Sequence, residues 1–458
     1  MTATVKNKKE MDLTSGSIFK KLILYSVPFV FSNILQILFN TADIAVLGIF
    51  VGDDAVAAVG ANGSLSGLLV NLFVAFSIGT NVVLARHVGA RNLDSARKTV
   101  GTSIMLAIIS GIVLLAIGVP LAPYFLQIMG CDLRVIDMAT TYLRIYFLGM
   151  PIMMLYNFCA SILRAVGDTK RPLIFLSIGG VVNVALNIFF VTVLKMTVEG
   201  VAIATITSQA ISATLSLVVL LKSNGYASLK IKNLKISKEQ FKEIIAIALP
   251  SALQSLAFNI SNVLIQTKIN SFGADGMAGA TTAQQFDAVV YNIGNAVAMS
   301  CMAFVSQNIG AKKMDRVKKT IYFAILICIM FTLSVGGLFA LLSPWLCGLI
   351  ANGEKVIEYA CTRLTIFGLT YFLCGIMEIF GNSNRAMGKP VVSMVVSILG
   401  ATVFRVIWLE ITLSIWHTYA TIYLSYLASW LVTIAVYIPM TIRVFKGVKR
   451  KIEQENMA

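Results

Sequence analysis

Residues 321–342 read IYFAILICIMFTLSVGGLFALL, a run of 22 residues without one charged side chain. A helix needs about 20 such residues to cross the hydrocarbon core of a bilayer, because each residue adds about 1.5 Å. Residues 104–121, IMLAIISGIVLLAIGVPL, form a second run of this kind. Of the 458 residues, 57% are hydrophobic and 13% are charged, whereas about 25% are charged in soluble domains. The sequence therefore predicts an all-α integral membrane protein.

Twelve apolar segments of the chain are predicted to be transmembrane helices. They are residues 22–50, 55–84, 98–121, 138–163, 172–194, 198–221, 242–269, 279–308, 317–342, 358–384, 391–414 and 418–443. Several exceed the length that a straight crossing needs, which indicates tilted helices or helices that extend beyond the hydrocarbon core.

The basic residues are divided unequally between the two sides of these segments. Of 37 Lys and Arg residues, 30 lie in the tails and loops of one side, and Arg405 lies deep within a segment. The other side carries Arg134, Arg144, Lys195, Lys268, Lys355 and Arg363. Because cytoplasmic loops are enriched in Lys and Arg, we expect a multi-pass protein of the plasma membrane with both termini cytoplasmic. The net charge of +16 is spread over short loops, which argues against nucleic acid as a partner.

The second half of the chain repeats the first at a shift of 221 residues. The shift superimposes Gly89, Ala90, Asp94 and Lys98 on Gly310, Ala311, Asp315 and Lys319, and Arg164, Ala165 and Gly167 on Arg385, Ala386 and Gly388. These matches fall on loop residues, so shared hydrophobicity does not explain them. Each half contains an even number of segments, which predicts two six-helix lobes in a parallel internal repeat.

The repeat also predicts the division of the chain into regions. We expect a cytoplasmic tail (1–21), an N-terminal lobe (22–221), a basic cytoplasmic linker (222–241), a C-terminal lobe (242–443) and a second cytoplasmic tail (444–458). A cleft between two such lobes would be the natural substrate path, and rocking of the lobes would give alternating access.

Several segments, taken in order, are similar to one known family. They are Pro28 to Gly48 with Asp43 inside, ARHVGARNLDSARK at 85–98, SQNIGAKKMDRVKK at 306–319, RAVGDTKRP at 164–172, RAMGKP at 385–390, and Asn183 to Gln209 with GVAIATITSQ. With these segments the whole chain resembles the multidrug and toxic compound extrusion (MATE) family of efflux transporters, in its prokaryotic form. The resemblance implies antiport, in which Na⁺ or H⁺ enters while organic, often cationic and amphiphilic, compounds leave.

Four polar residues lie at similar depth in the predicted N-terminal lobe. Asp43, Asn187 and Thr205 each lie about seven residues, or about 10 Å, from the outer end of a segment, and Asn183 is one helical turn from Asn187. Charged groups at membrane depth are costly and are functional candidates. Their oxygen atoms suit a hard cation such as Na⁺, and a buried carboxylate equally suits a proton. The resemblance places the N-lobe cation site at the same positions.

One position departs from the family pattern. Many prokaryotic members carry Asp within a sequence like LDPLF, where this chain has Leu186, Asn187, Ile188 and Phe189. Asp43 is therefore the only carboxylate of the predicted site, which argues against a relay between two carboxylates and leaves Na⁺ and H⁺ as alternatives.

The predicted C-terminal lobe carries charges of both signs inside the membrane. A shift of 218 residues places Arg405 opposite Asn187, and Asp287 lies at a similar depth. We expect Asp287 and Arg405 to pair or to share a polar network. Glu378 lies nearer the cytoplasmic side, which argues against direct contact with Arg405, and is a candidate for coupling, substrate contact or a structural hydrogen bond.

The predicted function is a cation-coupled antiporter for organic compounds, a monomer whose partners are small-molecule substrates and the lipid bilayer. The alternative is a flippase for a lipid-linked substrate, although the phosphates of such a substrate favour a strongly cationic cavity and only Arg405 lies deep. Motifs such as HExxH and GxSxG are absent from the sequence, so an enzyme is not expected. No cofactor is expected beyond the coupling ion.

Overall fold

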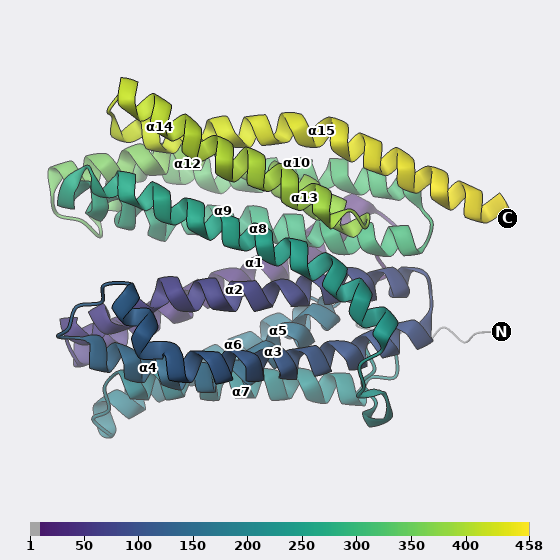
Figure 1. The fold of residues 1–458 in the computed structure, drawn as a ribbon, viewed down its shortest axis with the longest axis horizontal. Coiled ribbons are helices and arrows are strands. Elements are labelled where there is room, and N and C mark those ends of the chain that lie inside the picture. Colours follow the sequence, from purple (N-terminus) through teal and green to yellow (C-terminus); the bar gives the residue numbers. More distant parts are fainter. Residues whose placement is uncertain (1–9, 458) are drawn as a thin grey trace. The chain divides into compact units, whose positions relative to one another are not determined.

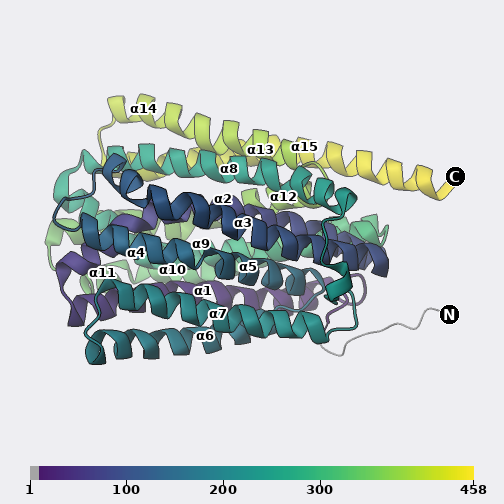
Figure 2. The ribbon, with the colours of Figure 1, turned by 60° about the horizontal axis from the view of Figure 1, so that its bottom comes forward.

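A computed structural model describes residues 10–457, and all regular secondary structure within that range is helical (Figures 1 and 2). The first half contains α1 (Ile18–Phe50), α2 (Asp53–Gly89), α3 (Leu93–Ile128), α4 (Ile136–Leu148), α5 (Met150–Ala165), α6 (Lys170–Ile188), the π-helix η1 (Phe189–Val193) and α7 (Val198–Lys222). A short 3₁₀ helix, η2 (Ile231–Asn233), lies in the segment that joins the halves.

The second half contains a similar series of elements. These are α8 (Lys238–Asn270), α9 (Gly273–Gly310), α10 (Met314–Leu341), α11 (Ser343–Gly348), α12 (Glu354–Ala386), α13 (Pro390–Ser397), the π-helix η3 (Ile398–Phe404), α14 (Arg405–Ile415) and α15 (Tyr419–Met457). The last helix continues through most of the segment predicted to be a C-terminal tail, 444–458.

Eleven helical segments of the described chain are long and apolar enough to cross a membrane, and the bent pair α4–α5 makes twelve. All twelve predicted segments correspond to these helices, so the predicted fold class is confirmed. Most helices extend several residues beyond the predicted bounds, because polar residues at their ends continue the helix outside the apolar run.

The segment predicted as one span at 138–163 is divided in two. The axes of α4 and α5 differ by 49° across Gly149. A Cβ atom at Gly149 would lie 2.4 Å from a side-chain atom of Ile206, so only glycine permits this approach of α7. Pro151 follows within the first turn of α5, where its fixed φ favours the start of a new helix. Hydropathy alone does not register this break.

Contacts between residues divide the chain into two compact units. The described part of the first unit consists of residues 10–12 and Val27–Ala248, and that of the second consists of Leu13–Ser26 and residues 249–457. The beginning of α1 therefore belongs to the second unit, and the beginning of α8 belongs to the first. The lobe bounds predicted from the repeat do not include this exchange of helix ends.

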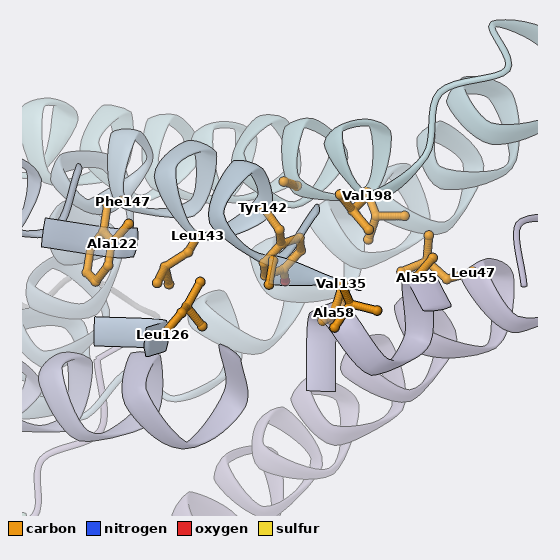
Figure 3. Packing of buried hydrophobic residues seen from close by; sticks show 14 of the residues in the cluster. Leu47, Ala55, Ala58, Ala122, Leu126, Val135, Tyr142, Leu143, Phe147 and Val198 are labelled. Carbon is orange, nitrogen blue, oxygen red and sulfur yellow. The ribbon is translucent and has the colours of Figure 1, made fainter. Parts of the chain in front are cut away.

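The core of the first unit depends on small residues of α3 that admit a large one of α4. The Phe147 ring lies beside Ala122 (Figure 3), and a Cβ atom at Gly118 would lie 2.2 Å from that ring. Leu126 and Leu143 continue the same contact. Small residues four apart allow helices to approach closely in a membrane, where packing rather than the hydrophobic effect holds helices together.

The second unit uses glycines in the same way. Gly336 of α10 and Gly368 of α12 face each other so closely that a Cβ atom on either would lie within 2.4 Å of the other's carbonyl oxygen. Beside this contact, aromatic rings of α12 and α15 form a cluster that includes Phe367, Tyr423 and Trp430. These contacts position the charged residues described below.

Candidate cation and substrate sites

Asp43 of α1 is the centre of a hydrogen-bond network in the first unit. Asn187 Nδ2 donates to Asp43 Oδ1 at 2.5 Å, and Thr205 Oγ1 donates to Asp43 Oδ2 at 3.1 Å. Asn183 lies within 3.4 Å of both Asn187 and Thr205. The four residues that sequence depth placed together therefore do converge, although up to 162 positions separate them. Their role in coupling stays a prediction.

The network contains one acceptor that is not satisfied. Asn187 is fully buried, and its Oδ1 atom has no hydrogen-bond partner among the described residues. A buried acceptor without a partner costs about 1–3 kcal/mol. Asp43 is also buried, at 7% exposure, and no basic residue pairs with it in the described part of the chain. A site with an excess of acceptor oxygens fits a small hard cation or a proton.

A small cavity adjoins Asp43 on the side of Asn183 and Thr205. Its volume is about 20 Å³, enough for about one water molecule or a small ion. The sequence analysis missed five polar residues that line it, the amides Gln36, Asn40 and Gln209 and the hydroxyls Ser208 and Ser212. Gln36 and Asn40 precede Asp43 by seven and three positions, so helical spacing could have found them.

Two consecutive glycines of α6 shape the wall of this cavity. A Cβ atom at Gly180 would lie 1.7 Å from the Phe39 ring, and one at Gly179 would lie 2.2 Å from Ser212 Oγ. These glycines allow α6 to approach both α1 and α7, which brings Asn183 and Asn187 to Asp43.

The charged residues of the second unit form a different ion pair from the one predicted. Asp287 pairs with Arg363, with 2.6 Å between Oδ2 and Nε, and not with Arg405. The alternative, a polar network that Asp287 and Arg405 share, stays a prediction. Depth counting assigned Arg363 to the outer side, but its side chain is only 11% exposed and lies against Phe367 and Tyr423. The long stem of arginine lets the guanidinium reach away from its backbone position, which a count of residues does not capture.

Arg405 lies at the first position of α14, directly after the π-helix η3. It is 2% exposed, donates from Nε to Ser429 Oγ at 2.9 Å, and lies over the Tyr426 ring at 4.0 Å. One residue, Ile188, separates Asn187, the counterpart of Arg405 in the repeat, from the start of η1. Single π-helical turns are frequent at functional sites, and here one adjoins each of the repeat-related polar positions.

Glu378 lines a narrow cleft of the second unit. The cleft is formed by α9 and α12, and its other lining residues include Tyr291, Asn295, Tyr371 and Cys374. Within the described chain Glu378 forms no ion pair with Arg405. The depth of Glu378 in the sequence also argued against such a contact. A carboxylate beside two aromatic rings is suited to an organic cation, because ring faces attract positive charge.

The family model MatE matches residues 28–189 and 250–409, one match in each half of the chain. The chain belongs to the MATE family of efflux transporters. The two matches also agree with the internal repeat.

Known transport proteins are similar to this chain over most of its length. The probable multidrug resistance protein YoeA of Bacillus subtilis is 27% identical over 394 residues, which cover 83% of this chain and 84% of YoeA. The FAD transporter of Shewanella oneidensis is 21% identical and covers 85% of this chain and 87% of its own. A solved multidrug resistance MATE family transporter in an outward-facing conformation has a TM-score of 0.88 at 22% identity and covers 97% of this chain and 100% of its own.

Proposed function

We propose that this MATE transporter is a cation-coupled antiporter that exports organic, cationic amphiphilic compounds by alternating access, with Asp43 as the coupling carboxylate. The observation that carries the proposal is the geometry around Asp43. Two donors stabilise its ionised form, and an unsatisfied acceptor, Asn187 Oδ1, adjoins it. The site is thereby poised to gain one positive charge.

The coupling ion would use the side chains that the network already assembles. Rotation of the Asn187 amide would replace Nδ2 by Oδ1 next to Asp43, which removes a donor and adds a ligand. Together with Asn183 Oδ1 and Thr205 Oγ1, these oxygens would hold Na⁺. A proton on Asp43 would instead need only one acceptor, and Asn187 Oδ1 offers one. Both ions are accordingly retained in the proposal.

Binding of the ion would change the contacts of α1. Asp43 neutralised by an ion no longer needs both donors, and α1 contains Pro28, whose ring removes one backbone hydrogen bond. We expect α1 to bend there when the hydrogen bonds to Asp43 change, and this bend would couple the ion to substrate release.

The transported cation would interact with the cleft at Glu378. Its carboxylate supplies charge, and Tyr291 and Tyr371 supply aromatic faces. The Asp287–Arg363 pair, whose charges neutralise each other, is assigned a structural role.

The test uses purified protein in liposomes with ethidium, a fluorescent organic cation. Na⁺ and H⁺ gradients are imposed separately on the parent protein and on Asp43→Asn, with Asp54→Asn as the matched control because Asp54 is exposed at the start of α2. We expect one gradient to drive export in the parent and the control and not in Asp43→Asn. Gradient-independent movement in all three proteins would refute the coupling.

A second variant separates the two ions. If Na⁺ is the coupling ion, Asn187→Ala removes a ligand and should raise the Na⁺ concentration needed for half-maximal export by about 10-fold. If H⁺ is the coupling ion, the variant should keep H⁺-driven export, because Asp43 remains and Thr205 Oγ1 beside it can replace Asn187 Oδ1 as the acceptor.

A further inference from the structure

Arg405 is a buried cation that no carboxylate neutralises. Among residues 10–457 its only hydrogen bond is to Ser429 and its only ring contact is with Tyr426. A guanidinium has five N–H donors, so most of its donor capacity is unused. Burial of a charge in a membrane interior is costly unless the charge is paired and hydrogen-bonded.

The other buried arginines of the same unit are better supplied with acceptors. Arg363 pairs with the Asp287 carboxylate. Arg385 donates to Asn382 Oδ1 and to Gln254 Oε1, each at 2.7 Å. Arg405 therefore differs from Arg363 and Arg385, because its one described acceptor is a hydroxyl and not a carboxylate or an amide oxygen.

Arg405 lies near residues of the cleft that Glu378 lines. Its electrostatic neighbours are Tyr426, Cys374 and Tyr371, and the last two also line the cleft. Glu378 follows Cys374 by one helical turn. Arg405 and Glu378 thus both lie near the same short stretch of α12.

We propose that Arg405 recognises an anionic oxygen group, a carboxylate or a phosphate, carried by a transported compound or by a lipid headgroup. Arginine binds both groups through two parallel hydrogen bonds. The proposal rests on the transporter function proposed above and extends its substrates to compounds that carry an acidic group. It assigns a different charge to each of the two residues, with Glu378 for a cationic group and Arg405 for an anionic one.

Trp430 provides a binding signal that needs no ion gradient. It is 2% exposed, and its ring centroid lies 5.5 Å from that of Tyr371 and 5.8 Å from that of Tyr426. The chain has four tryptophans, and the other three, Trp345, Trp408 and Trp416, are exposed. Replacing these three by phenylalanine leaves Trp430 as the only tryptophan.

The experiment titrates this single-tryptophan protein with two naphthalene probes of opposite charge, 2-naphthoate and 2-naphthylmethylammonium. We expect saturable quenching by naphthoate in the parent. Arg405→Met should weaken naphthoate binding by about 10-fold or more and change binding of the ammonium probe by no more than about twofold. The naphthoate affinity of Arg405→Lys should lie between those of the parent and Arg405→Met. Glu378→Gln should have the opposite selectivity.

Three results would overturn the proposal: no saturable binding of naphthoate to the parent, an equal loss of both probes in Arg405→Met, or no difference between Arg405→Met and Arg405→Lys. If Arg405→Met does not fold, Ser429→Ala tests the same site, because loss of the hydroxyl that accepts from Arg405 Nε should change naphthoate binding and leave the ammonium probe unchanged. Naphthoate binding is measured without an ion gradient, so failure of ion coupling is distinguishable from failure of this proposal.

Nanodiscs distinguish the two sources of the anionic group. If a lipid headgroup occupies the site, phosphatidylglycerol should weaken naphthoate binding relative to phosphatidylcholine alone, and Arg405→Met should abolish that competition. If the group belongs to a soluble compound, decyl phosphate in solution should compete and phosphatidylglycerol should not. Competition by neither phosphate would contradict the phosphate part of the proposal.

Discussion

Replacing Asp287 by alanine leaves the Arg363 guanidinium buried without the carboxylate that neutralises it. The two side chains are 3% and 11% exposed, and 2.6 Å separates their nearest atoms. At this distance, and at an effective dielectric constant of 20, their attraction is about 6 kcal/mol. Because desolvation offsets part of this attraction, removal of one partner from a buried pair costs about 3–5 kcal/mol. We expect Asp287→Ala and Arg363→Ala each to lower the free energy of unfolding by that amount.

The double variant Asp287→Leu/Arg363→Met distinguishes an ion pair from two independent contacts. Exchange of both charges for apolar side chains of similar volume is often neutral, so the double variant should be more stable than either single one. The assay is unfolding by SDS in mixed micelles, followed by the fluorescence of the buried Trp430.

The matched control for this experiment is Glu410→Ala. Glu410 pairs with Lys268 at 2.8 Å, but its side chain is 57% exposed, so the free energy of unfolding should change by less than about 1 kcal/mol. If the double variant is less stable than either single variant, the pairing account is wrong.

Two further predictions concern the first unit. Gly180→Val should close the cavity and lower ethidium export, because a Cβ atom at this position would lie 1.7 Å from the Phe39 ring. Gly337→Val is the control and should export ethidium normally, because a Cβ atom there would meet open space. Burial raises the pKa of Glu10 from 4.5 to about 7, so the stability that its proton contributes is present below about pH 4.5 and is lost as the pH rises through about 7. Thermal unfolding of Glu10→Gln should therefore depend less on pH over this range than that of the parent, and identical pH profiles would contradict the burial of Glu10.

The sequence predicted those parts of the site that depend on depth within regular helices. Asp43, Asn187 and Thr205 lie on three helices, and counting residues from the helix ends placed them at one level, where the structure finds them in contact. Apolar runs likewise predicted the helices, because the bilayer fixes the length that a span requires.

Depth counting failed where a side chain or a helix leaves its regular path. The stem of Arg363 carries the charge to Asp287. To predict whether Asp287 pairs with Arg363 or with Arg405, one must know how α12 and α14 are oriented about their own axes. The break at Gly149 depends on the packing of Ile206, a contact between helices that a single segment does not encode. The orientation of the termini in the membrane stays a prediction from the distribution of basic residues.

Ion movement driven by the substrate tests the central claim most directly. Liposomes with equal Na⁺ and equal pH on both sides would receive an ethidium gradient, and radioactive Na⁺ and a pH-sensitive dye would report ion movement. The account predicts that the parent moves one of the two ions opposite to ethidium and that Asp43→Asn moves neither. Ethidium movement without ion counterflow in the parent, or equal counterflow in Asp43→Asn, would contradict it.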